Sequence, residues 1–250
     1  MTDHTTDIEA AIQTHLTQTN TRISQINANG QHVWIKRNVP ERLRRRLFKG
    51  NTSKAFEAER TAIHTLQTIG APVPHILAEG HDFMAFADSG QTLHEMLRRR
   101  HGTQAERVIA FEAAGKALAK LHNSGYSHGR PAVRDMCWKD GCVTFLDLER
   151  YSPRRNTAKG HRNDLIIFVY SLFSCAGEDT AEAQIACQAY RDSDEYGHWN
   201  AAALLCSRMG FLDWTTRPLQ KRKGKKSWEF KAIPLTFQAF RRDLSTQSIE

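Results

Sequence analysis

Two short runs of alternating hydrophobic and polar residues flank Asn29-Gly30, in RISQINANGQHVWIKR. Asn-Gly between two alternating runs is a strong signal for a β-hairpin with a two-residue turn. In the second run, Val33 and Ile35 fall on one face of the predicted strand and Lys36 on the other. The pattern therefore predicts a hairpin that buries one face and presents a lysine on the opposite one.

Two helices and two further strands are expected around this hairpin. Residues 7–17 carry apolar side chains at helical spacing, and so do residues 53–69, which run into Gly70. Glycine directly after the last periodic residue is typical of a helix end. Short strand-like pieces follow near 75–79 and 83–87. This part of the chain thus combines a small sheet with helices.

The later part of the chain is richer in helical patterns. Helices are expected over 92–101 and 105–123, and another near 234–244. Asp140-Gly141 predicts a second hairpin turn. Residues 162–175, RNDLIIFVYSLFSC, are apolar nearly all round, which is typical of a buried helix.

The order of these elements predicts an α+β fold with two lobes. Residues 1–88 would form a small β-rich lobe with one main helix, and residues 89–250 a larger, mostly helical lobe. A chain of 250 residues is long enough for two such lobes in one domain.

Composition places the chain among ordinary globular proteins, with 40% hydrophobic and 25% charged residues. No apolar run reaches the roughly 18 residues of a membrane-spanning helix, and the polar start MTDHTTDIEAA predicts no secretory signal. The five cysteines form no C-x-x-C pair, so neither a disulfide framework nor a zinc site is indicated. We expect a cytoplasmic protein.

The formal charge of +8 favours anionic partners: a nucleotide, a nucleic acid or an anionic membrane face. The excess gathers in two groups: Arg42, Arg44, Arg45, Arg46 and Lys49, and then Lys221, Arg222, Lys223, Lys225 and Lys226. Solvated loops explain such groups equally well. Tryptophans beside the second group are more typical of a core than of base stacking, so no nucleic-acid contact is expected.

Candidate chemistry comes from four features in a fixed order. They are a strand lysine (Lys36), a helix glutamate (Glu59), a loop beginning His128-Gly129, and Asp147 at the end of a hairpin strand. Each alone is commonplace. In this order they match the set with which kinases hold ATP, where a lysine binds phosphates, a glutamate pairs with it and an aspartate holds Mg²⁺.

The chain resembles the lipopolysaccharide (Kdo/heptose) kinase family of the protein-kinase-like superfamily. The resemblance runs from about Val33 to Leu172 and rests on five motifs: VWIKR, FEAERTAIHTLQTIGAPVP, FADSGQTL, KALAKLHNSGYSHG and FLDLER. It implies a two-lobed kinase-like fold, ATP and Mg²⁺ as cofactors, and a sugar or protein hydroxyl as phosphate acceptor. The two basic groups add two expected partners: an anionic acceptor, such as a lipopolysaccharide sugar or a protein, and the anionic inner face of the membrane as a peripheral contact.

Carried over by position, the resemblance makes Lys36 the phosphate-binding lysine and Glu59 its partner. Glu57 competes for that role from a different face of the same helix. Asp147 becomes the principal Mg²⁺ ligand. Asp164 corresponds to a buried aspartate that braces the catalytic loop, or else it is a helix N-terminal charge favoured by the dipole.

The predicted catalytic loop, His128 to Asp135, departs from the usual H-x-D-x-x-x-x-N. Arg130 stands at the position of the base, and Asp135 at that of the metal-binding Asn. No glycine-rich stretch precedes Lys36, since LTQTNTRISQ has no glycine.

Two interpretations follow from this loop. In the first, the chain is an ATP-dependent kinase whose catalytic residues are Asp135, Arg130 and His128. Arg130 would neutralise phosphoryl charge there, and Asp135 would bind metal or act as base. In the second, it is a pseudokinase with a binding or regulatory role.

Overall fold

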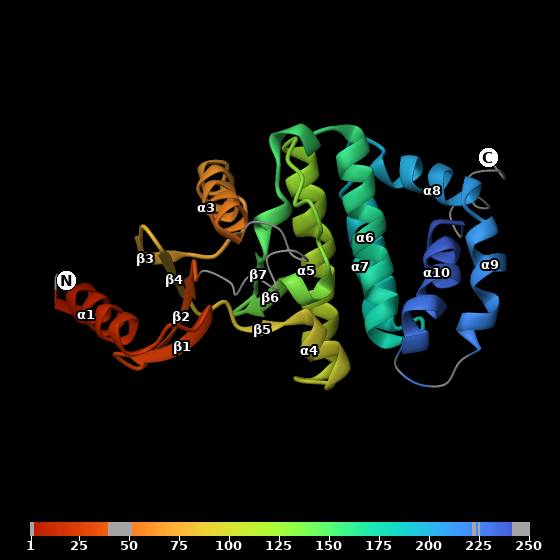
Figure 1. Ribbon diagram of the computed structural model, residues 1–250. Coiled ribbons are helices and arrows are strands. Elements are labelled where there is room, and N and C mark those ends of the chain that lie inside the picture. Colours follow the sequence, from red (N-terminus) through yellow and green to blue (C-terminus); the bar gives the residue numbers. More distant parts are fainter. Residues whose placement is uncertain (1–2, 40–51, 222–223, 225, 242–250) are drawn as a thin grey trace. The chain divides into compact units, whose positions relative to one another are not determined.

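The computed structural model of the protein describes residues 3–39, 52–221, 224 and 226–241 (Figure 1). These residues form two compact units, Met1–Gly90 and Gln91–Glu250. The first basic group of the sequence, Arg42 to Lys49, lies outside the described residues, as do Arg222, Lys223 and Lys225.

The first unit contains one four-stranded antiparallel sheet in the order β1-β2-β4-β3. Its elements, in chain order, are α1 (Asp3–Gln18), β1 (Ile23–Ala28), β2 (Gln31–Arg37), α3 (Thr52–Thr68), β3 (Ile76–Gly80) and β4 (Phe83–Ala87). Every element expected here from the sequence is present. The leading helix begins four residues earlier than its apolar pattern indicated.

The hairpin of the first unit forms where Asn29-Gly30 predicted it. Asn29 and Gly30 have φ angles of 51° and 73°, the left-handed conformation that a two-residue turn requires. The alternation of β2 also holds, because Val33 and Ile35 are fully buried and pack with Ile12 of α1. The opposite face of β2 is thereby left to Lys36.

The second unit is mostly helical and contains a three-stranded antiparallel sheet in the order β5-β6-β7. Its strands are β5 (Gln91–Thr92), β6 (Met136–Lys139) and β7 (Cys142–Phe145), and its short 3₁₀ helices are η1 (Val133–Asp135), η2 (Leu148–Arg150) and η3 (Pro153–Arg155). Its α-helices are α4 (Leu93–Arg98), α5 (Gln104–Asn123), α6 (Ala158–Ala176), α7 (Ala181–Asp192), α8 (His198–Arg208), α9 (Phe211–Gln220) and α10 (Lys226–Arg241).

Sequence signals fix the start of α5 and the turn between β6 and β7. Thr103 accepts from the backbone N–H of Glu106, whose carboxylate accepts from the Thr103 N–H, so a capping box starts α5. Asp140 and Gly141 turn with φ angles of 50° and 83°, as the Asp-Gly pattern predicted. The second hairpin is therefore confirmed.

Helices α5 and α7 approach each other closely at Gly115. A Cβ atom at that position would lie 2.2 Å from the carbonyl oxygen of Ala186. Only glycine allows two helix backbones to pack at this distance. The buried core around them includes Phe111, Leu118 and Tyr190.

The α+β class predicted from the sequence is confirmed, with most of the described residues in helices and two small antiparallel sheets. The protein-kinase-like arrangement of the elements stays a prediction. Within the residues that the structure describes, no helix is long and apolar enough to cross a membrane.

Candidate functional site

Lys36 and Glu59 form an ion pair in the first unit. The Lys36 ammonium group donates a hydrogen bond to the Glu59 carboxylate, and the two side chains are only 14% and 7% exposed. Strand β2 presents Lys36 on the face opposite Val33 and Ile35, and α3 presents Glu59. The pair predicted from the sequence is thus present, with both charges largely withdrawn from water.

Glu57, the alternative partner, points elsewhere. Its carboxylate lies 3.4 Å from Arg60 Nη1, and its side chain is 51% exposed. Residues two apart on a helix lie on different faces, so only one of the two glutamates can reach β2. The structure selects Glu59.

In the second unit, the loop after α5 is fixed by Asp164 of α6. Asp164 Oδ2 accepts from the backbone N–H groups of His128, at 2.7 Å, and Gly129, at 2.9 Å. Asp164 is buried, and two N–H donors satisfy its charge. Of the two roles that the sequence allowed for Asp164, the structure shows the bracing one.

Only glycine fits at position 129 of this loop. Its φ angle is 96°, and a Cβ atom there would lie 2.4 Å from the carbonyl oxygen of Arg150. Arg155 Nη1 also donates to the Gly129 carbonyl at 3.0 Å. No sequence pattern points to Arg155, because its contact depends on how η3 packs on the loop.

Arg130 lies against both aspartates that the sequence assigned to metal. Arg130 Nη2 is 2.6 Å from Asp147 Oδ2 and 3.5 Å from Asp135 Oδ2. Asp147 follows β7 in the left-handed conformation, with φ 55° and ψ 52°. Few non-glycine residues adopt it, aspartate more readily than most. The turn directs the carboxylate of Asp147 toward Arg130.

Burial and the neighbouring charge of Asp147 raise the pKa of Asp135 to about 6, while Arg130 acts in the opposite direction. Two carboxylates that repel each other in partly buried surroundings favour a cation between them. In this structure the guanidinium of Arg130 is that cation.

The residues present fit a Mg²⁺ ion. Mg²⁺ prefers carboxylate oxygens and is commonly held by one or two of them together with substrate phosphates. Asp135 and Asp147 offer such a pair once Arg130 moves aside. Within the described parts of the chain, no group of three or more His, Cys, Asp or Glu side chains is arranged to hold a metal.

His128 is fully buried and therefore supports the loop from inside. Its Nδ1 lies 3.4 Å from the Arg130 backbone nitrogen, and its ring packs edge-on against Phe145 at 5.4 Å. Burial lowers the pKa of His128 to about 4, so the ring is neutral at neutral pH. With no exposed surface, the side chain of His128 contacts the loop and Phe145, and its catalytic role stays a prediction.

Three buried histidines pack together beside Asp164. The ring centroids of His122 and His161 are 4.9 Å apart, and those of His161 and His198 are 4.8 Å apart. His122 Nδ1 shares a hydrogen bond of 2.7 Å with the Tyr190 hydroxyl. Sequence reasoning missed this cluster, because its members come from three different helices.

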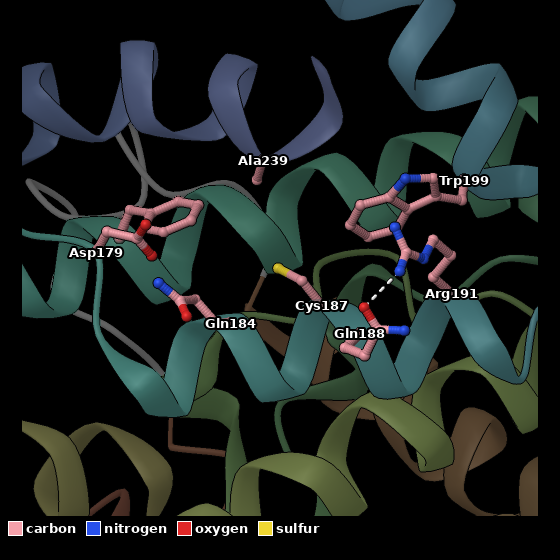
Figure 2. A pocket seen from close by; sticks show the side chains of 8 residues that line it. Asp179, Gln184, Cys187, Gln188, Arg191, Trp199 and Ala239 are labelled. Atoms are coloured by element: carbon pink, nitrogen blue, oxygen red, sulfur yellow. Dashed lines mark hydrogen bonds between the residues drawn. The ribbon is translucent and has the colours of Figure 1, made fainter. Parts of the chain in front are cut away.

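The second unit contains a hollow of about 210 Å³. Figure 2 shows side chains that line it. Arg191 and Gln188 of α7 are hydrogen-bonded at its edge, beside Trp199 of α8. Its described lining contains none of the residues that the sequence singled out. It adds nothing to the site around Arg130.

Comparison with known proteins found two relatives. An uncharacterized protein of Haemophilus influenzae is 29% identical over 203 residues, which span 80% of this chain and 82% of that protein. A probable bifunctional tRNA threonylcarbamoyladenosine biosynthesis protein of Haloquadratum walsbyi is 23% identical over 175 residues, 66% of this chain but 32% of that protein. No family model matches the chain.

Proposed function

We propose that the protein is an ATP- and Mg²⁺-dependent phosphotransferase with a protein-kinase-like fold, of the lipopolysaccharide-kinase type. The observation that carries the proposal is the ion pair of Lys36 and Glu59. A buried ion pair is costly to form and is weak evidence for stability alone. A lysine held by one carboxylate in a fixed position is suited to bind the phosphates of a nucleotide.

The second unit supports the same proposal with its own residues. Asp164 fixes the loop, and the loop presents Arg130 beside Asp135 and Asp147. When bound, Mg²⁺ supplies neutralisation of the phosphate oxygens. Asp135 and Asp147 would hold it, and Arg130 would then be free to pair with the transferred group.

In this reaction the γ-phosphoryl group leaves the oxygen that bridges it to the β-phosphate and joins the oxygen of an acceptor hydroxyl. The hydroxyl proton passes to Asp135 or to solvent, because a guanidinium cannot accept it. Arg130 stabilises charge on the moving group, a role that needs no base when the transition state is loose.

The second candidate is a nucleotide-binding pseudokinase. It is favoured by the contact of Arg130 with Asp147, which places a fixed positive charge where Mg²⁺ would bind. The likeness to the tRNA threonylcarbamoyladenosine biosynthesis protein covers about a third of that protein, and we take no substrate from it.

Titration with ATP, with and without Mg²⁺, tests the proposal by thermal unfolding and by release of ADP. A ligand that binds the folded state raises the unfolding midpoint. Lys36→Gln should abolish the ATP-induced rise, measured against the variant's own ligand-free midpoint. Lys116→Gln removes an exposed lysine of an ion pair on α5 and is the matched control. Absence of both ATP binding and ADP release would remove the proposal.

A further inference from the structure

Helix α9 carries apolar side chains on two opposite faces. It packs against α10 in the second unit, yet none of its ten residues is buried (Figure 1). Leu212 and Leu219 lie on its half-buried face. Phe211, Trp214 and Pro218 follow one another at helical spacing on the other face, which is open to solvent. Packing within the unit thus accounts for only one of the two apolar faces.

The two aromatic side chains of the open face are strongly exposed. Phe211 is 62% exposed and Trp214 is 71% exposed. The sequence favoured a core position for the tryptophans beside the second basic group, and for Trp214 the structure contradicts this. Large apolar side chains that are neighbours on an exposed face are typical of an interaction surface.

The charges around this face are mostly positive. Arg217, whose side chain is 64% exposed, and Lys221 lie along one edge of the apolar stripe. A Cβ atom at Gly210 would lie 3.2 Å from Arg241 Nη2, so a third cation lies at the start of α9. Asp213 is the one acid of α9, and its Oδ2, 3.7 Å from Arg217 Nη2, offsets one of these charges. The balance of these four charged groups stays positive.

A helix with this pattern fits the interface of an anionic bilayer. Tryptophan and phenylalanine prefer the boundary between headgroups and acyl chains, and lysine and arginine beside them reach anionic headgroups. A single-stranded nucleic acid also combines flat apolar surface with negative charge, but it binds to rings that line a continuous basic groove. On α9 a proline continues the stripe and the cations lie at its margins. The pattern therefore favours the bilayer.

We propose that the open face of α9 docks the protein on an anionic lipid bilayer. The helix lies along the surface, Phe211 and Trp214 enter the boundary of headgroups and acyl chains, and Arg217 and Lys221 contact the headgroups. The basic groups of the sequence predicted membrane contact through charge alone, whereas this face adds apolar insertion. The inference does not rest on the proposed phosphotransferase function, because none of these residues belongs to the site around Arg130.

Sedimentation with liposomes tests the docking face without any nucleotide. Vesicles of phosphatidylcholine are compared with vesicles rich in phosphatidylglycerol. The protein should bind the anionic vesicles, and binding should weaken as salt is raised, since exposed charges are screened beyond about 8–10 Å. Part of the binding should persist at high salt, because apolar insertion does not depend on charge. No binding to the anionic vesicles at low salt would overturn the inference.

Phe211→Ser combined with Trp214→Ser should weaken vesicle binding at least about tenfold, because two aromatic side chains no longer leave water. Ile109→Ser is the matched control, since Ile109 of α5 is an exposed apolar side chain on another helix of the second unit. Undiminished binding of the double variant, or an equal loss in Ile109→Ser, would contradict docking through α9.

Arg217→Gln combined with Lys221→Gln should reduce the preference for anionic over neutral vesicles. Lys116→Gln is the control, because Lys116, like Arg217, is an exposed helix cation paired with an acid four residues earlier. The same preference in the double variant and in the unmodified protein would show that these two cations do not meet the headgroups.

Insertion of Trp214 has a readout of its own. Lipids with brominated acyl chains should quench its fluorescence. Trp214→Phe keeps an aromatic side chain and should bind vesicles like the unmodified protein, while losing most of the quenching. This variant separates insertion from a folding defect. Binding without quenching in the unmodified protein would mean contact through charge alone and would refute insertion.

Two other partners are outcomes of the same test. Binding of a labelled single-stranded oligonucleotide that is lost in the variant without Phe211 and Trp214, together with no vesicle binding, would assign the face to nucleic acid. A dimer in sedimentation velocity that dissociates in that variant, again without vesicle binding, would assign it to a second copy of the chain. Either result removes the bilayer. Vesicle binding without ATP binding leaves the docking face and removes only the phosphotransferase.

Discussion

Arg130 Nη2 lies 2.6 Å from Asp147 Oδ2, so the two side chains form an ion pair. Arg130 stands where the loop would carry its base, and Asp147 is the residue that would bind Mg²⁺. The same nitrogen is 3.5 Å from Asp135 Oδ2. Opposite charges attract more strongly in partly buried surroundings than in water. If the proposed Mg²⁺ takes both carboxylates, it would compete with the guanidinium of Arg130 for them.

Arg130→Ala should therefore separate metal binding from turnover. Without the guanidinium, Asp147 loses this partner and Asp135 keeps only its looser contact with Arg134, so the Mg²⁺-dependent part of the ATP-induced thermal shift should grow. Phosphoryl transfer should fall by about 10³-fold or more, the range seen when a transferring phosphoryl loses its arginine. Arg154→Ala, at an exposed arginine of η3, should change neither quantity. Turnover equal to that of the unmodified protein would exclude a role for Arg130 in transfer.

Asp147→Asn should remove the Mg²⁺-dependent part of ATP binding, because an amide is a far weaker ligand for a hard cation than a carboxylate. Asp140→Asn is a close control. Asp140 also has a left-handed backbone, with φ 50° against 55° for Asp147, so the two substitutions make the same change on the same conformation. Equal Mg²⁺ effects in both variants would reduce Asp147 to a turn residue.

Glu59→Gln should destabilise the protein by roughly 3–5 kcal/mol, because it leaves the Lys36 charge buried without its partner. Glu112→Gln breaks an exposed pair with Lys116 on α5 and should cost less than about 1 kcal/mol. Urea unfolding of the two variants and of Lys36→Gln with Glu59→Gln measures this. A cost for Glu59→Gln as small as that for Glu112→Gln would contradict a buried pair.

The folded state should become less stable as the pH decreases, because of the cluster of His122, His161 and His198. Burial, then the charges of His122 and His198, lower the pKa of His161 from 6.5 to about 4, and burial also lowers that of His198. Below pH 6.5 the histidines of the unfolded chain bind protons, whereas His161 of the folded chain stays neutral until about pH 4. The contribution of this cluster to stability is therefore fully present above pH 6.5 and is lost as the pH falls toward 4.

Two carboxylates, those of Asp164 and Asp194, face this cluster and favour the protonated form of its histidines. Asp164 Oδ2 lies 3.7 Å from His122 Nε2, and Asp194 acts on His198 to raise its pKa. His161→Gln should flatten the loss between pH 7 and pH 5, measured as the urea midpoint. His64→Gln, at a half-exposed histidine paired with Glu79, should leave the loss unchanged. The same slope in both variants would show that the cluster does not carry it.

Local structure was predictable wherever neighbouring residues decide it. Asn29-Gly30 and Asp140-Gly141 form their turns because few other pairs adopt two positive φ angles without cost. Gly70 ends α3 for the same reason, with φ 68°. The Lys36–Glu59 pair was expected from the order of the motifs and from the family resemblance, and the structure contains it.

Contacts between distant segments were not predictable in this way. Arg98 has the pattern of a solvated helix charge, and the ring beneath it belongs to Trp228 of α10. His122, His161 and His198 come from α5, α6 and α8, and no sequence period links them. The contact of Arg130 with Asp147 depends on the distance between a loop and a strand end, which no sequence pattern supplies.

The loop after α5 contains no helix or strand before η1, yet Asp164 binds two of its backbone amides inside the protein. The amides of His128 and Gly129 are buried and donate to a carboxylate of α6. Amides of loops usually exchange their hydrogens with solvent quickly, whereas we expect these two to be protected like amides of a core. They should exchange only when α6 moves away from the loop, and their exchange rate should report the opening of that packing rather than the motion of a surface loop.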